Sequence, residues 1–220
     1  MVKGIYEFET KLIGSGVSAK GRKNAISSFP FLLMTIISSW FFSTVYRVIK
    51  KETGVGFACK IIKKDGGMND FKSMINEVEI MKRVRHRHVV SMHELFESPT
   101  CFWLILELAD GGDLRFLMEK HKPFSEAVVR RYTRQILEGL EYLHSRGVVH
   151  RDIKLDNLLL HGDRETGDIK IADFGLSALV KVGSASYDCT NPQSLKGYDK
   201  LDKRWGCPLY CAPELVEVML

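Results

Sequence analysis

Residues 150–157 read His-Arg-Asp-Ile-Lys-Leu-Asp-Asn, and this stretch decides how the rest of the sequence is interpreted. Asp152, Lys154 and Asn157 form a compact polar loop directly after a helical pattern and the pair Val148-Val149. Phosphoryl transfer needs such a set, namely a carboxylate that accepts a proton from a hydroxyl, a cation near the moving phosphate and an amide oxygen for a metal ion. The loop therefore predicts phosphoryl-transfer chemistry.

A second acidic motif follows twenty-one residues after Asp152. Asp173-Phe-Gly175 comes directly after the predicted strand Ile169-Lys-Ile171. A carboxylate at the end of a strand, followed closely by a glycine, is well placed to hold Mg²⁺. Asp173 is therefore the second predicted metal ligand beside Asn157.

Upstream, a lysine lies in a strand-like run and a glutamate in a helix-like run. Lys60 follows Ala58-Cys59, and a charge in a strand needs a partner, which Glu77 supplies seventeen residues later. Each motif alone has a plainer explanation: an edge lysine, a solvated helix charge, a turn, or a loop at Gly14-Ser-Gly16. Their order and spacing together favour one phosphate-binding site.

Hydrophobic periodicity predicts a strand-rich first part and a helix-rich second part that meet near Gly111-Gly112. Strands are expected at 6–13, 43–49, 56–62, 101–108 and 169–171, and helices at 68–84 and from Ser125 to Arg146-Gly147. The apolar faces of the two helices are expected to be Phe71, Met74, Ile75, Val78, Met81 and Val84, and Val129, Tyr132, Ile136, Leu140 and Leu143. Two lobes with a cleft between them are the expected architecture.

Composition restricts the class of protein. The chain has 220 residues, 45% of them hydrophobic, and a formal net charge of +5. This mild basic excess is not the dense basic stripe of a nucleic-acid-binding domain, so no nucleic-acid partner is expected. The five cysteines show no C-x-x-C spacing and predict neither a disulfide framework nor a zinc site. Reduced thiols and an N-terminus unlike a signal peptide make a cytoplasmic location the default.

Taken together, these motifs resemble the eukaryotic protein kinases of the serine/threonine type, from roughly Tyr6 to Glu214. The runs Asn76-Glu-Val-Glu-Ile-Met81 and Gly111-Gly-Asp-Leu114 are similar to the calcium/calmodulin-dependent group. The resemblance implies transfer of the γ-phosphate of ATP to protein Ser/Thr hydroxyls, with Mg²⁺. A catalytically inactive kinase fragment or pseudokinase-like binding module is the alternative.

The resemblance also assigns roles to single residues. It makes Asp152 the catalytic base, Lys154 the partner of the transferred phosphate, and Asn157 and Asp173 the metal ligands. Lys60 would anchor the α- and β-phosphates and pair with Glu77. The residues that it implies for ATP binding are Gly14, Gly16, Val45, Ala58, Lys60, Glu77, Glu107, Ala109, Asp113 and Leu159. Among them, Val45, Ala58 and Leu159 would line the adenine pocket, residues 107–109 would form the hinge with Leu106 as gatekeeper, and Asp113 would lie by the ribose or a basic substrate residue.

The implied fold is α+β: an antiparallel sheet with one helix in the N-lobe, residues 6–109, and a mainly helical, incomplete C-lobe, residues 110–220. The implied partners are a protein substrate, an upstream kinase acting on the activation segment, and calmodulin or calcium regulation outside this chain. Arg151, before the catalytic Asp, favours control by phosphorylation. The candidate acceptors are Ser184, Ser186, Tyr187, Thr190, Ser194 and Tyr198.

Three features depart from the family pattern. Residues 17–40 interrupt the Gly-rich loop, and we expect them to be a translated intron. The alternatives are a membrane insert and a surface loop. A membrane insert is disfavoured because it would place two strands of one hairpin on opposite sides of the bilayer. The chain ends six residues after Ala212-Pro-Glu214, from which we expect poor folding or inactivity of the polypeptide as written. Cys207 stands where the family usually has a threonine, and a thiol is a weaker hydrogen-bond donor.

Overall fold

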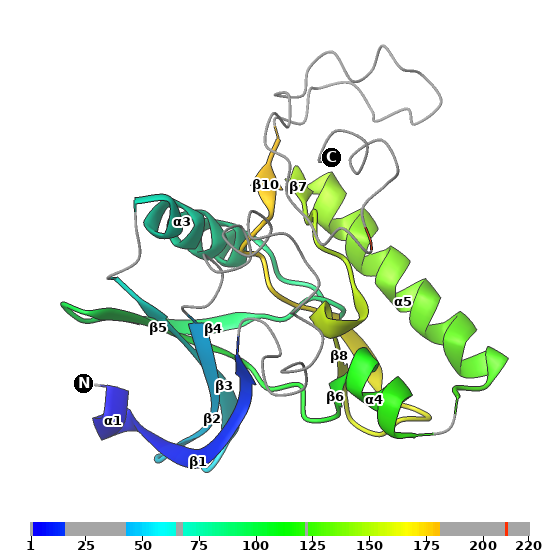
Figure 1. The fold of residues 1–220 in the computed structure, drawn as a ribbon, viewed down its shortest axis with the longest axis horizontal. Helices are drawn as coiled ribbons and strands as arrows, with labels where there is room; N and C mark the ends of the chain where they lie inside the picture. Colours follow the sequence, from blue (N-terminus) through cyan, green and yellow to red (C-terminus); the bar gives the residue numbers. More distant parts are fainter. Residues whose placement is uncertain (1, 16–42, 65–67, 122, 181–209, 211–220) are drawn as a thin grey trace, which may run out of the picture. The chain divides into compact units, whose positions relative to one another are not determined.

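A computed structural model of the chain describes residues 2–15, 43–64, 68–121, 123–180 and 210 (Figure 1). The chain divides into two compact units, Met1–Met74 with Met92–Leu108, and Ile75–Ser91 with Ala109–Leu220. The chain therefore crosses between the units after Met74, after Ser91 and after Leu108, and the last crossing lies in the range 107–109 that was expected as the hinge. Gly16, the interruption at 17–40, Cys207, Glu214 and the candidate phosphorylation sites of the activation segment lie outside the described residues.

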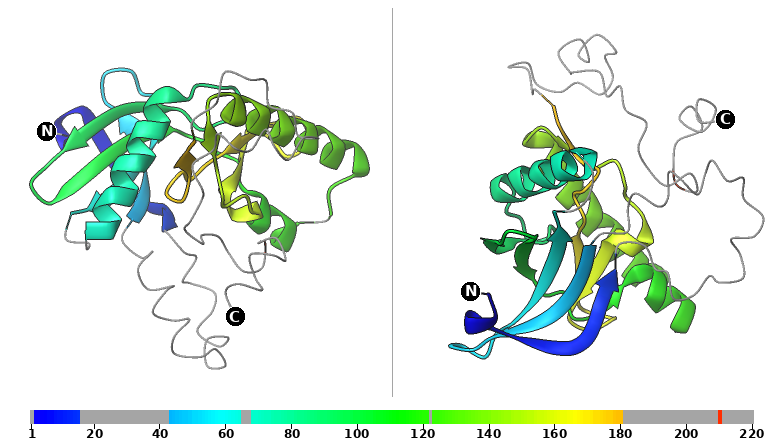
Figure 2. Two further views of the ribbon diagram at one scale, coloured as in Figure 1. Left: turned by 90° about the horizontal axis from the view of Figure 1, so that it is seen from above. Right: turned by 60° about the vertical axis from the view of Figure 1, so that its left-hand side comes forward.

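The first unit contains an antiparallel sheet of five strands in the order β1-β2-β3-β5-β4 (Figure 2). Its elements are α1 (Val2–Ile5), β1 (Tyr6–Ser15), β2 (Ser43–Lys50), β3 (Gly56–Lys63), β4 (Met92–Glu97) and β5 (Cys101–Glu107). The strands expected at 6–13, 43–49, 56–62 and 101–108 are confirmed within one or two residues. β4 was not expected, because Met92–Glu97 alternates only weakly between apolar and polar residues.

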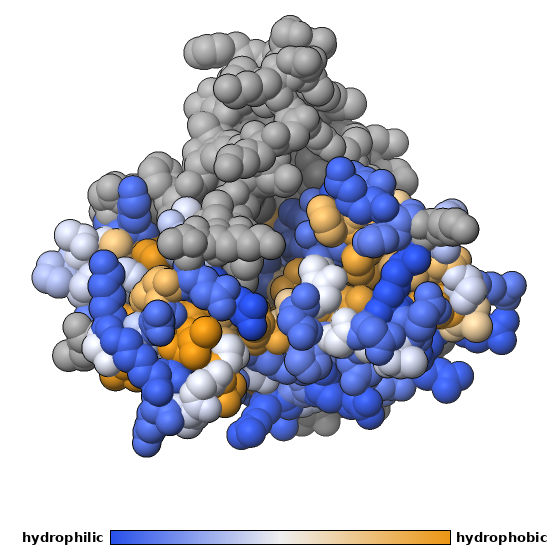
Figure 3. Space-filling model, turned by 90° about the horizontal axis from the view of Figure 1, so that it is seen from below, coloured by the Kyte–Doolittle hydropathy of each residue, from blue (hydrophilic) through white to orange (hydrophobic). Residues whose placement is uncertain are grey.

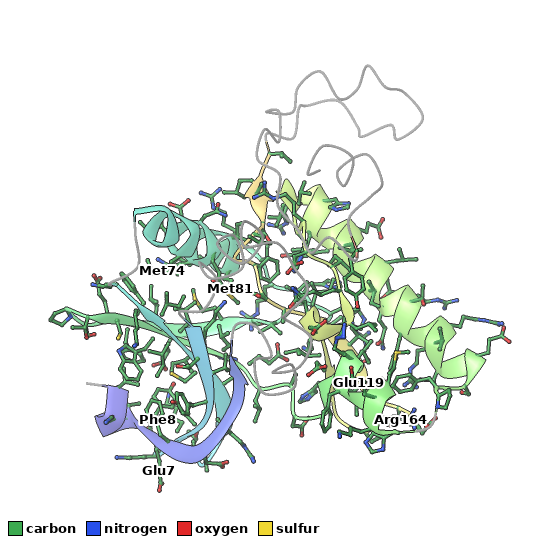
Figure 4. The ribbon with its side chains drawn as sticks, in the orientation of Figure 1. Glu7, Phe8, Met74, Met81, Glu119 and Arg164 are labelled. Atoms are coloured by element: carbon green, nitrogen blue, oxygen red, sulfur yellow. The ribbon has the colours of Figure 1, made fainter. Side chains whose placement is uncertain are left out.

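Aromatic side chains pack the core of the first unit. Tyr6 is almost fully buried, and its ring meets those of Phe57 and Phe96 edge to face, with centroids 6.0 and 6.3 Å away. Figure 4 shows the alternation expected of a strand, since Phe8 points to this cluster and its neighbour Glu7 points away. The sheet is therefore held by one packed face.

The second unit is built from helices and short strands. Its elements are most of α3 (Met68–Arg83, which begins in the first unit), β6 (Gly112–Asp113), α4 (Leu114–Lys120), α5 (Glu126–Ser145), β7 (Val148–Val149), a 3₁₀ turn η2 (Leu155–Asn157), β8 (Leu158–His161), β9 (Asp168–Ile171) and β10 (Ala178–Leu179). β6, β8 and β9 form one antiparallel sheet and β7 pairs with β10. The α+β class is confirmed.

The ends of α5 are the ones that its sequence predicts. The Ser125 hydroxyl accepts the Val128 amide hydrogen at the N-terminus, and the helix ends at Arg146, followed by Gly147 with φ 70°. The predicted buried face is wrong at Val129, whose side chain is 48% exposed. The buried positions are Val128, Tyr132, Gln135, Gly139 and Leu143, so the buried face is shifted by one residue at the start of the helix.

In α3, one of the side chains predicted to be buried, Ile75, is exposed. Met74 and Met81, labelled in Figure 4, are buried together with Val78, as expected from their spacing. Ile75 is 41% exposed, against expectation. The next two residues, Asn76 and Glu77, turn toward other segments of the second unit.

The surface in Figure 3 is mainly hydrophilic, with apolar side chains exposed in patches between charged ones. Within the described residues, no helix is long and apolar enough to cross a membrane.

Candidate active site

Asp152 is the centre of a hydrogen-bonded network in the loop between β7 and β8. Its side chain is 3% exposed, and its Oδ2 accepts from Lys154 Nζ at 2.6 Å and from Asn157 Nδ2 at 2.9 Å. Asn157 Nδ2 also donates to the Asp152 backbone carbonyl at 2.8 Å. The structure thus brings together the three residues that the sequence singled out, and one carboxylate oxygen holds both the cation and the amide.

The side chain of His150, two residues before Asp152, holds this loop in place. His150 Nε2 lies 3.0 Å from the Ala172 carbonyl, and its ring packs at 5.2 Å from that of Phe174. Burial lowers the pKa of His150, so the imidazole is neutral and donates to that carbonyl. The His150 ring therefore joins the loop that carries Asp152 to the segment that carries Asp173.

Arg151 and Asp173 both have left-handed backbones, with φ of 67° and 66°, and they are the only described residues other than glycine that do. This conformation is costly for residues with a Cβ and persists only where other contacts enforce it. Arg151 is held by its guanidinium, which donates to the carbonyls of Leu176 and Ser177 at 2.5 and 3.2 Å. The sequence carries no signal for either strained position.

Asp173 follows β9 at the position where a metal ligand was expected. Its side chain is exposed, while the next residue, Phe174, is completely buried. A buried aromatic anchor directly after Asp173 holds the carboxylate at the surface of the second unit. The amide of Ala172, the residue before, donates to the Asn157 carbonyl at 2.9 Å, so the two predicted metal ligands lie on directly bonded segments.

α3 reaches the same segment through two adjacent polar side chains. Asn76 Nδ2 donates to the Ser177 carbonyl at 2.7 Å. Glu77 is buried, and a Cβ built on Gly175 would lie 3.8 Å from Glu77 Oε2 and 3.4 Å from Asp173 Oδ1. The Glu77 carboxylate therefore lies beside the Asp-Phe-Gly turn, and sequence reasoning missed the role of Asn76 because a lone polar residue on a helix has no distinctive pattern.

In the first unit, the sheet register gathers predicted ATP-binding residues on one face. Val45 pairs with Gly14 on β1 and with Lys60 on β3, and Ala58 lies two residues before Lys60. Lys60 is buried, 9% exposed, and a buried ammonium needs an anionic or polar partner. Its pairing with Glu77, which belongs to the other unit, stays a prediction.

The remaining predicted residues lie where the chain enters the second unit. Glu107 ends β5 and Ala109 begins the second unit, and both are half-buried. Asp113 pairs with Leu159 between β6 and β8, and its Oδ1 accepts the Phe116 amide hydrogen at 2.8 Å as the N-cap of α4. Asp113 thus caps α4, and its predicted role beside the ribose or a basic substrate residue stays a prediction.

The donor set suits Mg²⁺. Because Asn157 Nδ2 donates to Asp152, its Oδ1 is the atom that remains for a cation, and Asp173 offers an exposed carboxylate. Mg²⁺ is usually bound by one or two protein oxygens together with substrate phosphates and water. In the described part of the chain, no three His, Cys, Asp or Glu side chains form a metal-ligand cluster, so a complete protein cage for a metal is not found there.

The geometry of this loop agrees with a comparison of the whole sequence. A model of the protein kinase domain matches residues 36–219, most of the chain. This chain belongs to the protein kinase family. The match to the kinase domain leaves β1 and Gly14 outside, and the roles predicted for Gly14 and Gly16 stay predictions.

Relatives of this kinase domain are named as protein kinases. It is 37% identical over 177 residues to CBL-interacting protein kinase 30 of Oryza sativa subsp. japonica, covering 80% of this chain and 34% of that protein. It is 38% identical over 176 residues to a probable myosin light chain kinase of Dictyostelium discoideum, covering 80% and 46%. Serine/threonine-protein kinase 33 of Mus musculus is 32% identical over 188 residues, covering 82% and 36%. The chain spans less than half the length of these relatives.

Proposed function

We propose that this chain is the catalytic domain of a protein serine/threonine kinase that uses ATP and Mg²⁺. The observation that carries the proposal is the network in which Asp152 Oδ2 accepts from both Lys154 and Asn157 inside a buried loop. Relatives at 32–38% identity are named as kinases, one of them as a serine/threonine-protein kinase. A lysine at position 154 favours Ser and Thr over Tyr as acceptors by resemblance to the family.

The proposed mechanism gives the two carboxylate oxygens of Asp152 different tasks. Because Oδ2 already accepts two hydrogen bonds, Oδ1 is the atom that orients the acceptor hydroxyl and takes its proton. The hydroxyl oxygen forms a bond to the γ-phosphorus, and the bond from that phosphorus to the β–γ bridging oxygen breaks. Positioning and charge stabilisation supply most of the catalysis in such transfers.

Lys154 and the predicted metal ligands would stabilise the negative charge of the phosphate groups. The Lys154 ammonium lies 2.6 Å from Asp152 Oδ2 and would face the oxygens of the transferred group. Mg²⁺, when bound, neutralises the phosphate oxygens, and Asn157 Oδ1 and Asp173 are the groups that would hold it. Lys60, on its face of the first sheet beside Val45 and Ala58, is the proposed anchor for the α- and β-phosphates.

The proposed partners are a protein substrate, an upstream kinase acting on the activation segment, and calcium or calmodulin acting through parts outside this chain. Arg151 supports control by phosphorylation only in part, because its guanidinium already donates to the carbonyls of Leu176 and Ser177. A phosphate on the activation segment would have to compete with, or add to, these two bonds.

The test is transfer of labelled phosphate from ATP to arrayed peptides with Ser, Thr or Tyr as the only hydroxyl. We expect transfer to Ser and Thr peptides, and a loss of about 100-fold or more in kcat for Asp152→Asn and Lys154→Met. Lys82→Met is the matched control for Lys154, since Lys82 is exposed on the last turn of α3. Its kcat should stay at the wild-type value.

A different result would identify a different class of protein. If Mg²⁺ and ATP raise the melting temperature but no peptide receives phosphate, the chain is a nucleotide-binding module and the catalytic proposal is wrong. Transfer that persists in Asp152→Asn would contradict the role of Asp152 even if the wild type is active.

A further inference from the structure

Arg115, the second residue of α4, forms an ion pair with the loop that carries the candidate active site. Its Nε lies 3.1 Å from Asp156 Oδ1 and 3.2 Å from Oδ2, and its side chain is 26% exposed. A second carboxylate belongs to Glu119, one turn along α4 and labelled in Figure 4. Its Oε1 lies 3.7 Å from Arg115 Nη1. The guanidinium is thus held mainly by Asp156.

Asp156 lies within the candidate active site by position in the chain. It is the middle residue of η2, two residues after Lys154 and directly before Asn157, both of which bond the Asp152 carboxylate. The side chain of Asp156 is 34% exposed, so it faces solvent at its outer edge. Asp156 is thus four residues along the chain from Asp152, the residue proposed to receive the acceptor hydroxyl.

Tyr210 extends the cluster to a third segment. Tyr210 is 43% exposed, and it contributes to the raised pKa of Arg115. The pKa of Arg115 is raised chiefly by Asp156, with smaller contributions from Tyr210 and Glu119 against the effect of burial. The guanidinium therefore links α4 and the η2 turn.

We propose that Arg115 determines specificity by masking Asp156 from the peptide substrate. An uncovered carboxylate beside the acceptor would attract an arginine or lysine of the peptide, since charge-assisted hydrogen bonds are the stronger ones. Because Arg115 Nε lies 3.1 and 3.2 Å from the two Asp156 oxygens, the charge of Asp156 is largely neutralised, and a basic peptide residue gains little there. This inference rests on the proposed function, and it defines the substrates as peptides not selected for a basic residue at that subsite.

The test measures binding of fluorescent peptides by anisotropy, so it does not depend on catalysis. Each peptide has a central Ser among alanines, with Arg, Ala or Glu at one of the three positions on either side. For the wild type, the Kd values of matched Arg and Ala peptides should agree within about twofold at each of these positions. For Arg115→Met, the Arg peptide should bind about fivefold more tightly than the Ala peptide at one position or more.

Four further variants separate masking from other roles of Arg115. Arg115→Lys keeps the charge and should keep the wild-type ratio, whereas Asp156→Asn and the double variant R115M/D156N should show no gain for Arg peptides. Arg130→Met is the matched control, because Arg130 forms an exposed pair with Glu126 on α5 at 2.8 Å. The gain in Arg115→Met should also fade in 1 M salt, where exposed charges are screened within about 3 Å.

The outcomes distinguish this inference from the proposed function. An unchanged ratio in Arg115→Met, a gain that survives in the double variant, or equal weakening for all peptides would overturn the masking role. If no peptide binds to any of the proteins, the masking role is also wrong. If peptides bind with the expected ratios but no phosphate is transferred to them, the proposed catalytic function fails and the masking role stands.

Discussion

Asn76 and Ser177, 101 residues apart, are joined by a hydrogen bond of 2.7 Å from the Asn76 side chain to the Ser177 carbonyl. The same carbonyl accepts from Arg151 Nη2 at 3.2 Å, and the Ser177 hydroxyl donates to the His150 carbonyl. Ser177 is completely buried. α3 and the loop of the candidate active site therefore meet on one residue of the segment that follows the Asp-Phe-Gly turn.

Replacing Asn76 should destabilise the protein through that bond. Asn76→Ala should lower the free energy of unfolding by about 1 kcal/mol, the usual net value of a hydrogen bond. Asn76→Asp should cost more, because a carboxylate would face the Ser177 carbonyl without a hydrogen to donate. Urea unfolding measures both, with Glu79→Ala on the exposed side of α3 as the control. An Asn76→Asp variant as stable as the wild type would contradict this account.

His86 should make stability fall in mild acid. Its pKa is lowered from the ordinary value, chiefly by burial and next by His88, and its ring stacks on Tyr142 at a centroid distance of 4.9 Å. The unfolded chain therefore takes up a proton first as the pH drops, so stability is complete above about pH 6.5 and decreases below it. His150, whose pKa is also lowered, acts in the same direction.

Urea unfolding between pH 7.5 and 5.5 measures this loss. In His86→Phe, which keeps an aromatic ring against Tyr142, the dependence on pH should be shallower by up to about 1.4 kcal/mol per pH unit. His144→Gln, at an exposed position near the end of α5, should keep the wild-type slope. Equal slopes for His86→Phe and wild type would show that His86 does not titrate differently in the folded state.

Cys59 should resist alkylation in the folded protein. It is completely buried in β3, and burial raises the pKa of its thiol to about 12. Because only thiolates react readily, iodoacetamide at pH 8 should modify Cys59 at least about 100-fold more slowly than the half-buried Cys101. Peptide mapping by mass spectrometry measures both rates, and 8 M urea should make them equal. Equal rates without urea would mean that the first sheet is not packed as described.

Motifs and periodicity predicted the parts of this molecule that depend on neighbouring residues. The polar loop of Asp152, Lys154 and Asn157 was predicted because its three members lie within six residues. The start of α5 at Ser125 was predicted, and the Ser125 side chain there bonds an amide only three residues away. Both depend on local chemistry, which the sequence displays directly.

Features that depend on distant partners were not predicted. Gln135 is buried in α5 although it is polar, because its Nε2 donates to Asp168 at 2.6 Å and its Oε1 accepts from the Ile169 amide at 2.9 Å. The contacts that hold the left-handed backbone of Arg151 and the pairing of Arg115 with Asp156 likewise involve segments 25 and 41 residues away. Hydrophobicity alone assigns such side chains to solvent.

Gly139 offers a test in which helix propensity and packing disagree. It lies inside α5, where replacing glycine by alanine stabilises an isolated helix by about 1 kcal/mol. Here a Cβ would lie 2.8 Å from Ile171 Cδ1 and 3.1 Å from the His88 carbonyl oxygen. Ile171 is completely buried and its amide donates to that same carbonyl, so neither neighbour can move without disturbing β9.

We therefore expect Gly139→Ala to lower the free energy of unfolding by about 1–3 kcal/mol, the usual cost of overpacking. Gly4→Ala, where a Cβ meets nothing within 4 Å, is the control and should change stability little. A Gly139→Ala variant more stable than the wild type would show that α5 does not pack against β9 this closely.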